Sequence, residues 1–218
     1  MEIALAKLFA IGIDPAKLID QFGRYAVIGV ILVVFAETGI LIGFFLPGDS
    51  LLFTTGLLIA TNTIDAPISV TVIGIIIAAI VGDQVGYQIG SRVGPALFTR
   101  PKSKLFNPKH VHRAQEFFDH HGPRTIILAR FVPIVRTFAP VVAGVGKMSL
   151  SQFTRYNVVG GIVWGGGVTL LGYALGKRYP WLADRIEILA IVIIAVSLIP
   201  VAFDLRRHLK AKKAGVTH

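Results

Sequence analysis

Four ionisable residues lie in or beside apolar stretches of this chain, close to two prolines that interrupt them: Glu37, Asp49, Arg130 and Arg136. A charged side chain inside hydrocarbon is costly, so such residues are normally paired or functional. Arginine suits phosphate because its planar guanidinium donates two parallel hydrogen bonds to an oxyanion. We therefore predict that Arg130 and Arg136 bind phosphate, and that Glu37 and Asp49 take up and release a coupling proton.

The breaks at Pro47-Gly48 and at Pro133 should bring two helix N-termini together near these residues. We expect one short helix to follow Asp49-Ser50, which would cap it, and a second to begin near Arg136. Helix N-termini favour anions, and a phosphate would compete with the two carboxylates for the arginines. The alternative is two structural salt bridges that only hold the broken helices in place.

Further residues have weaker signals. Asp83 is a candidate secondary polar site, either for a second proton or for a contact between helices. Gly82, Gly86 and Gly90 recur at every fourth position and predict close helix packing. We interpret Trp164 as a packing residue and Trp181 as an interfacial anchor.

The composition indicates an integral membrane protein. The chain has 218 residues, of which 54% are hydrophobic and 16% charged, and its mean hydropathy is +0.70. Its net charge of +10 comes from basic residues in connections and at the tail, which favours positive-inside topology over nucleic-acid binding. The absence of cysteine excludes disulfides, and the histidines match no standard metal site. No nucleotide-binding or hydrolase motif is present, so we expect no metal, no cofactor and no enzymatic activity.

The chain repeats itself at an offset of 86 residues, which matches Pro47 with Pro133 and Gly86 with Gly172. Each copy predicts a Pro-broken re-entrant hairpin followed by one transmembrane helix, with the second copy inverted. The expected fold is therefore an all-α integral membrane protein with an inverted repeat and an extra C-terminal transmembrane helix. Inverted repeats with broken helices place their substrate near the membrane midplane. The predicted segments are an amphipathic interfacial stretch (1–24), repeat 1 (25–91), a basic cytoplasmic loop (92–122), repeat 2 (123–178), and a final span with a basic cytoplasmic tail (179–218).

Three blocks, at residues 45–49, 82–87 and 130–137, resemble the DedA family of membrane proteins. They are Phe45-Leu46-Pro47-Gly48-Asp49, Gly82-Asp83-Gln84 with Gly86-Tyr87, and the run from Arg130-Phe131 to Arg136-Thr137, which continues to Ala143-Gly144. Glu37 also belongs to the resemblance. The resemblance implies a lipid translocase related to eukaryotic scramblases of the vacuole membrane protein kind. Members are implied to recycle undecaprenyl phosphate or to flip phosphatidylethanolamine, with the proton-motive force implicated. The essential acids and arginines of the family correspond to Glu37, Asp49, Arg130 and Arg136.

The expected function is proton-linked translocation of undecaprenyl phosphate or a related phospholipid in a bacterial cytoplasmic (inner) membrane. The expected partners are a lipid phosphate or phospholipid headgroup, protons and membrane lipids; homo-oligomerisation stays open. A passive phospholipid scramblase would need a polar groove without an obligatory anion site. A cation/proton antiporter would bind its ion at Glu37 and Asp49, whereas a non-transport scaffold leaves the broken helices unexplained.

Overall fold

A computed structural model describes residues 25–39, 48–98, 122–186, 188–189 and 192. Within these ranges the regular elements are all helices, as predicted. The interfacial segment 1–24, Pro47, most of the basic loop, most of the final span and the whole basic tail lie outside the described residues. Their predicted placement, and the re-entrant character of the hairpins, stay predictions.

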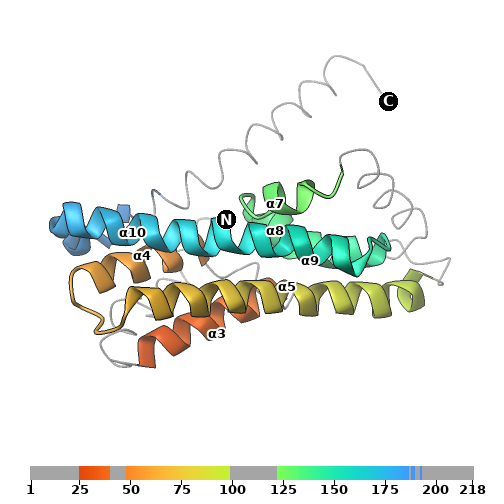
Figure 1. The fold of residues 1–218 in the computed structure, drawn as a ribbon, viewed down its shortest axis with the longest axis horizontal. Coiled ribbons are helices and arrows are strands. Elements are labelled where there is room, and N and C mark those ends of the chain that lie inside the picture. Colours follow the sequence, from red (N-terminus) through yellow and green to blue (C-terminus); the bar gives the residue numbers. More distant parts are fainter. Residues whose placement is uncertain (1–24, 40–47, 99–121, 187, 190–191, 193–218) are drawn as a thin grey trace, which may run out of the picture.

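Two long, antiparallel helical rods run along the length of the molecule (Figure 1). One is α5 (Ile68–Phe98); the other joins α9 (Leu150–Gly161), a π-helical turn η3 (Ile162–Gly166) and α10 (Gly167–Arg178). Their most apolar parts contain 25 and 29 residues. At about 1.5 Å of rise per residue, either rod exceeds the ~30 Å hydrocarbon thickness of a bilayer. The antiparallel arrangement is what an inverted second copy requires.

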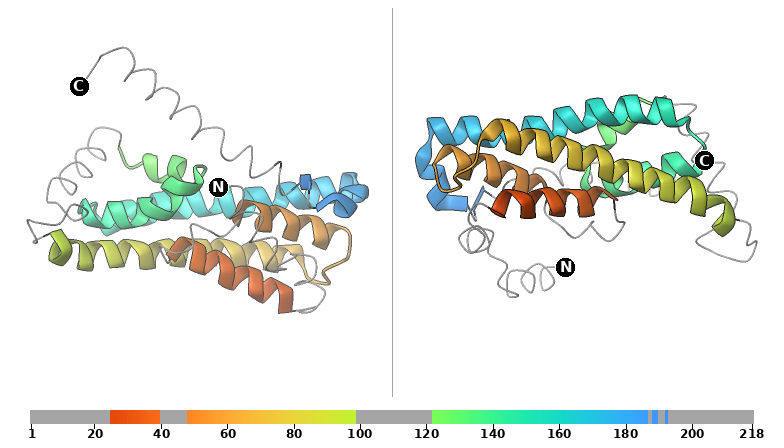
Figure 2. Two further views of the ribbon diagram at one scale, coloured as in Figure 1. Left: turned by 180° about the vertical axis from the view of Figure 1, so that it is seen from behind. Right: turned by 60° about the horizontal axis from the view of Figure 1, so that its bottom comes forward.

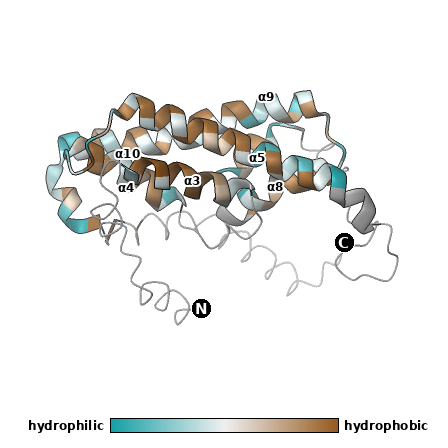
Figure 3. Ribbon diagram, turned by 90° about the horizontal axis from the view of Figure 1, so that it is seen from below, coloured by the Kyte–Doolittle hydropathy of each residue, from teal (hydrophilic) through white to brown (hydrophobic). Residues whose placement is uncertain are grey.

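The two rods are apolar along much of their length (Figure 3). On α5 the exposed side chains include Val70, Ile73 and Ile77, which are 63%, 57% and 55% exposed. They recur every three or four residues and so form one stripe along the helix. A long exposed apolar stripe fits contact with lipid.

In the described part of the chain, five shorter helices pack around the rods: α3 (Ala26–Gly39), α4 (Gly48–Ala60), α7 (Thr125–Ala129), α8 (Pro133–Val145) and the 3₁₀ turn η4 (Pro180–Arg185). Helices α4 and α8 have 13 residues each and are about 20 Å long, so each is shorter than a bilayer is thick. They match the two short helices predicted after the breaks.

Both predicted helix starts were slightly wrong. Helix α4 begins at Gly48, so Asp49 lies in its first turn and not at a cap outside it. Helix α8 begins at Pro133, three residues before Arg136, because proline fits the first helical position, where its missing N–H is not needed. Each of these two charged residues therefore projects from the first turn of a short helix.

Two of the short helices pack on the long rod of the other repeat: α4 lies along α10, and α8 lies along α5. The orange α4 stays beside the blue α10 in both views of Figure 2. Glycine makes this close approach possible. A Cβ on Gly172 would lie 2.1 Å from the carbonyl oxygen of Phe53, and one on Gly90 would lie 2.2 Å from that of Val141. The packing role predicted for the glycine ridge is confirmed.

The glycines that the repeat matches have the same packing role in the two halves. Gly86 and Gly172 both face the other repeat's short helix, and a Cβ on Gly86 would lie 3.3 Å from the Cβ of Pro140. Gly56 on α4 and Gly144 on α8 complete the pattern, since each lies against the backbone of a long helix. The apolar core lies between these interfaces and includes Trp164. This arrangement brings the first turns of α4 and α8 to the middle of the rods.

Candidate functional site

Arg136 links three helices through two carboxylates. Its Nη2 donates to Oε1 of Glu37 on α3 at 2.5 Å, and its Nη1 donates to Oδ1 of Asp49 on α4 at 2.6 Å. The side chains of Glu37 and Arg136 are buried, and that of Asp49 is 18% exposed. The structure thus brings together three of the four residues singled out in the sequence, as one cluster that joins the two repeats.

Gly48 gives Glu37 room at the start of α4. A Cβ on Gly48 would lie only 1.9 Å from Oε2 of Glu37, so a larger residue would displace the carboxylate. The carboxylate therefore lies against the N-terminal end of α4, where the partial positive charge of the helix favours an anion. Gly48 therefore acts at this helix start by leaving room for an acid.

Arg130 forms a second cluster with partners of its own. Its Nη2 donates to Asp83 on α5, to Oδ1 of Asn157 on α9 at 2.5 Å, and to the carbonyl oxygen of Ala79 at 3.3 Å. Asp83 is thus the counter-ion of Arg130, and the polar contact between helices predicted for it is present. The sequence predictions did not include Asn157.

Two small features hold Arg130 in position. Asn157 is fixed by donating from Nδ2 to the carbonyl oxygen of Ile80 at 3.0 Å. Gly160 lets the arginine pass, since a Cβ there would lie 2.8 Å from its Cδ. The signal for Asn157 was present in the sequence, as an amide side chain one turn before the first glycine of an apolar span. It was not used because an amide carries no charge.

Trp164 lies between the two clusters; it packs in the apolar core, as predicted, and also makes polar contacts that were not predicted. Its Nε1 donates to Oδ1 of Asp49 at 2.7 Å. The guanidinium carbons of Arg136 and Arg130 lie 4.4 and 5.9 Å from its ring centroid. Trp164 is 1% exposed and belongs to the π-helical turn η3, a type of distortion that often occurs at functional sites. One side chain therefore contacts both arginines and one acid.

The charges of the site are unequal. Three carboxylates (Glu37, Asp49 and Asp83) face two guanidiniums (Arg130 and Arg136). The two acids and two arginines singled out in the sequence have balanced charges. Asp83 adds a third acid, so the site has one carboxylate in excess. Within the described ranges, five buried polar atoms have no hydrogen-bond partner: Oε2 of Glu37, Oδ1 of Asp83, Nε of Arg136, and both Nε and Nη1 of Arg130.

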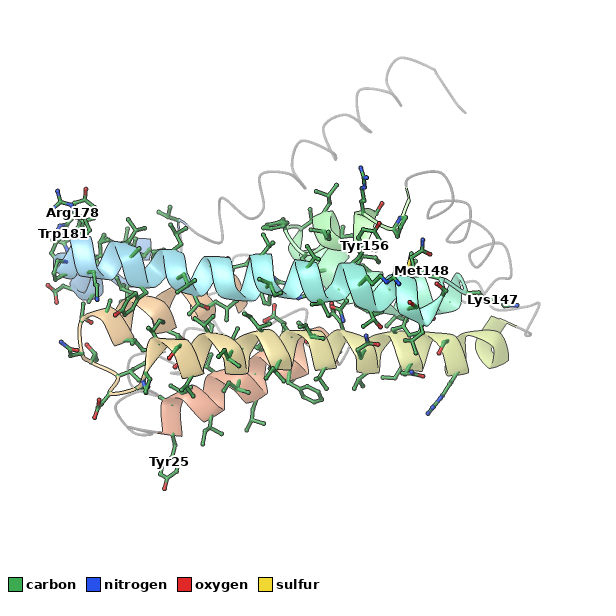
Figure 4. The ribbon with its side chains drawn as sticks, in the orientation of Figure 1. Tyr25, Lys147, Met148, Tyr156, Arg178 and Trp181 are labelled. Atoms are coloured by element: carbon green, nitrogen blue, oxygen red, sulfur yellow. The ribbon has the colours of Figure 1, made fainter. Side chains whose placement is uncertain are left out.

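The predicted helix breaks and the remaining sites are placed as follows. Pro133 is the first residue of α8 and Gly48 the first of α4, whereas Pro47 lies outside the described residues. Among the described residues no group of three or more metal-ligating side chains comes together. Trp181 is exposed near one end of the long rods, as Figure 4 shows, and this position fits an interfacial anchor.

Comparison with known proteins gives the family. The VTT domain matches residues 46–174, which include both arginines, Asp49, Asp83, Asn157 and Trp164. Protein DedA of Escherichia coli K12 is 43% identical over 201 residues, covering 92% of this chain and 91% of that protein. An uncharacterized membrane protein of Mycobacterium tuberculosis H37Rv is 43% identical over 192 residues, covering 88% and 84%.

A more distant relative is the inner membrane protein YqjA of Escherichia coli K12. It is 35% identical over 149 residues, which is 67% of this chain and 66% of that protein. No solved structure matches the chain. The domain match covers more than half of the sequence, and the first relatives are matched over nearly their whole length. The chain therefore belongs to the DedA family of VTT-domain membrane proteins.

Proposed function

We propose that this protein is a proton-linked translocase that moves undecaprenyl phosphate or a related phospholipid between the leaflets of a bacterial cytoplasmic membrane. One observation carries the proposal. A buried arginine, Arg136, is held by two carboxylates from different helices of the other repeat. A phosphate that enters the site competes with the carboxylates for the N–H groups of the arginines.

Protons enter this exchange through the charge balance. With all groups ionised the two clusters carry one net negative charge, and an uncompensated charge inside a membrane is costly. One proton on the carboxylates removes that charge and also weakens their hold on Arg136. Protonation thus prepares the site for an anion, and loss of the proton returns the acid to the arginine and expels the anion.

The packing of the two repeats supports alternating access. Helices α4 and α8 each lie on the rod of the other repeat, and their first turns carry Asp49 and Arg136. A small movement of one repeat against the other would change which side of the membrane reaches these charges. We expect both basic segments, at 92–122 and in the tail, on the cytoplasmic side.

The excess carboxylate favours one alternative, a cation/proton antiporter that binds its cation at the acids. The two functions differ in cargo, so a single set of proteoliposomes separates them. A fluorescent lipid phosphate would be followed between leaflets with and without a pH gradient, and Na⁺ or K⁺ would be added in parallel while the internal pH is recorded. The proposal expects lipid movement that rises with the gradient and no pH change driven by either cation.

Glu37→Gln is the decisive variant, because it mimics a permanently protonated acid. It should keep basal lipid movement and lose the response to the gradient. Asp65→Asn is the matched control, since Asp65 is exposed in the turn between α4 and α5 and should leave the response intact. Cation-driven pH changes without lipid movement would identify an antiporter. Lipid movement that ignores the gradient in the unaltered protein would identify a passive scramblase.

A further inference from the structure

The two arginines differ in how much of their hydrogen-bonding capacity the protein uses. Both terminal nitrogens of Arg136 donate hydrogen bonds to carboxylates. Arg130 places all three of its contacts on Nη2, and its Nε and Nη1 are buried without an acceptor in the described part of the chain. A guanidinium has five N–H donors, of which Nε and Nη1 supply three. Arg130 therefore has more unused donors than Arg136, in which only Nε is without an acceptor.

The local charges point the same way. Arg136 faces two carboxylates, so its cluster has a net negative charge when all its groups are ionised. Arg130 has one acid, Asp83, and a neutral amide, Asn157, so its cluster is balanced. An anion is repelled less at Arg130, whereas a proton is attracted more strongly to the acids around Arg136.

We propose that the two clusters have different roles. The unused donors of Arg130 bind the oxyanion of the cargo, a phosphate monoester. Arg136 and its two acids form the group that responds to protons. Asp83 is then the resident counter-ion that the cargo competes with, and Asn157 is a positioning residue that holds Nη2 while the other donors turn to the ligand. Trp164 contacts both guanidiniums, so its environment changes when either of them binds a ligand or changes partner. This inference rests on the proposed function, because it assigns the cargo of that function to one of two arginines.

Trp164 also supplies the measurement. The chain has two tryptophans, so Trp181→Phe leaves Trp164 as the sole tryptophan, beside the proposed site, and it can be excited at wavelengths that tyrosine does not absorb. In detergent solution, geranyl phosphate would be titrated as a short lipid phosphate and inorganic phosphate as the free anion. Binding of either probe at Arg130 should change the fluorescence of Trp164, because it neutralises a cation near the indole ring.

Asp83→Asn is the sharpest variant because it predicts a gain. It keeps an acceptor for Nη2 but removes the competing charge, so the affinity for geranyl phosphate should rise by about tenfold. Asp49→Asn, which relieves Arg136 instead, should give a clearly smaller gain. Asp65→Asn is exposed, removes the same charge far from the site's contacts and should leave affinity unchanged. A gain in affinity cannot result from misfolding.

The arginines are compared by Arg130→Lys and Arg136→Lys, which keep the charge and lose the planar donor set. Arg130→Lys should weaken binding by about tenfold or more, and Arg136→Lys should weaken it much less while abolishing the response of transport to pH. The melting temperature of each variant is recorded alongside, so that a loss caused by unfolding is recognised.

The possible results separate this inference from the proposed function. Larger effects at Asp49 and Arg136 than at Asp83 and Arg130 would overturn this assignment of roles and leave lipid-phosphate transport standing. Equal binding of inorganic and geranyl phosphate at Arg130, without lipid movement in proteoliposomes, would support the anion site and count against lipid as cargo. Absence of binding by either probe to the unaltered protein would overturn the anion site itself.

Discussion

Arg136 and Glu37 are 99 positions apart in the chain, yet Nη2 of the arginine and Oε1 of the acid meet at 2.5 Å. The contact joins α8 to α3 and is buried on both sides. Asp49 reaches the same guanidinium from α4, so one side chain of repeat 2 holds two helices of repeat 1. The stability of the fold and the chemistry of the site thus depend on the same residue.

The first prediction is that replacing Arg136 destabilises the protein more than replacing Glu37. Arg136→Gln leaves the buried carboxylate of Glu37 facing the partly buried one of Asp49, so it should lower the free energy of unfolding by about 3–5 kcal/mol. Glu37→Gln leaves Arg136 bonded to Asp49 and should have a much smaller effect. Reversible unfolding in mixed micelles would measure both. Equal losses would show that Asp49 does not hold the arginine as the geometry indicates.

The second prediction concerns the glycine contacts. Gly90→Ala should destabilise the protein strongly, because its Cβ would lie 2.2 Å from the backbone oxygen of Val141. Gly86→Ala should be milder, since the nearest atom is a side-chain carbon at 3.3 Å, whereas Gly86→Leu should disrupt the packing. Thermal stability in detergent and cargo preference in liposomes are the two readouts. A stable Gly90→Ala protein, or a changed cargo preference in any of these variants, would contradict a pure packing role.

Gly29→Ala is the matched control for that series. Gly29 lies on α3 with nothing within 4 Å of an added Cβ, so the change has no steric cost. Alanine also loses less backbone entropy than glycine on forming a helix, which should stabilise the protein by roughly 0.5–1 kcal/mol. Destabilisation by Gly29→Ala would show that glycine matters here for a reason other than close approach.

The third prediction is that Trp164 acts through its indole N–H. Trp164→Phe keeps an aromatic ring near both arginines but removes the donor to Asp49. The pH dependence of lipid movement should shift, while the melting temperature should fall only moderately. Trp181→Phe is the control, because Trp181 is exposed at one end of the rods and should change neither readout. If the Trp164→Phe protein had an unaltered pH profile, the only role of Trp164 would be packing.

The fourth prediction is the orientation of the rods. Figure 4 shows Lys147 at one end of the rods, with Arg178 and Trp181 at the other. Because α5 leads into the basic loop at the end where Lys147 lies, that end should face the cytoplasm. The chain has no cysteine, so Lys147→Cys and Trp181→Cys each carry one label site. An impermeant maleimide applied from outside should label the second and spare the first in intact cells; the reverse pattern would invert the topology.

The sequence was sufficient for the features that depend on local composition. An apolar run as long as 68–92 predicts a membrane helix, because backbone N–H and C=O groups in lipid must form their hydrogen bonds within the segment. The spacing of Gly82, Gly86 and Gly90 likewise predicted close packing, since glycine at every fourth helical position leaves one face without side chains. The importance of Asp49 and Arg136 followed from the cost of charge near lipid, which any fold must meet.

Only the tertiary structure decided which charge meets which. Asp83 and Arg130 are 47 positions apart, and nothing in their local sequence distinguishes this partnership from one between Arg130 and Glu37. The choice depends on the register in which α5, α8 and α9 pack, and that register follows from where glycines allow backbones to approach. Asn157 and Trp164 entered the site for the same reason: their side chains point inward because η3 and α9 are rotated to bury that face. Hydrogen bonds depend on distances of a few ångströms between helices, and those distances are set by packing across the whole molecule.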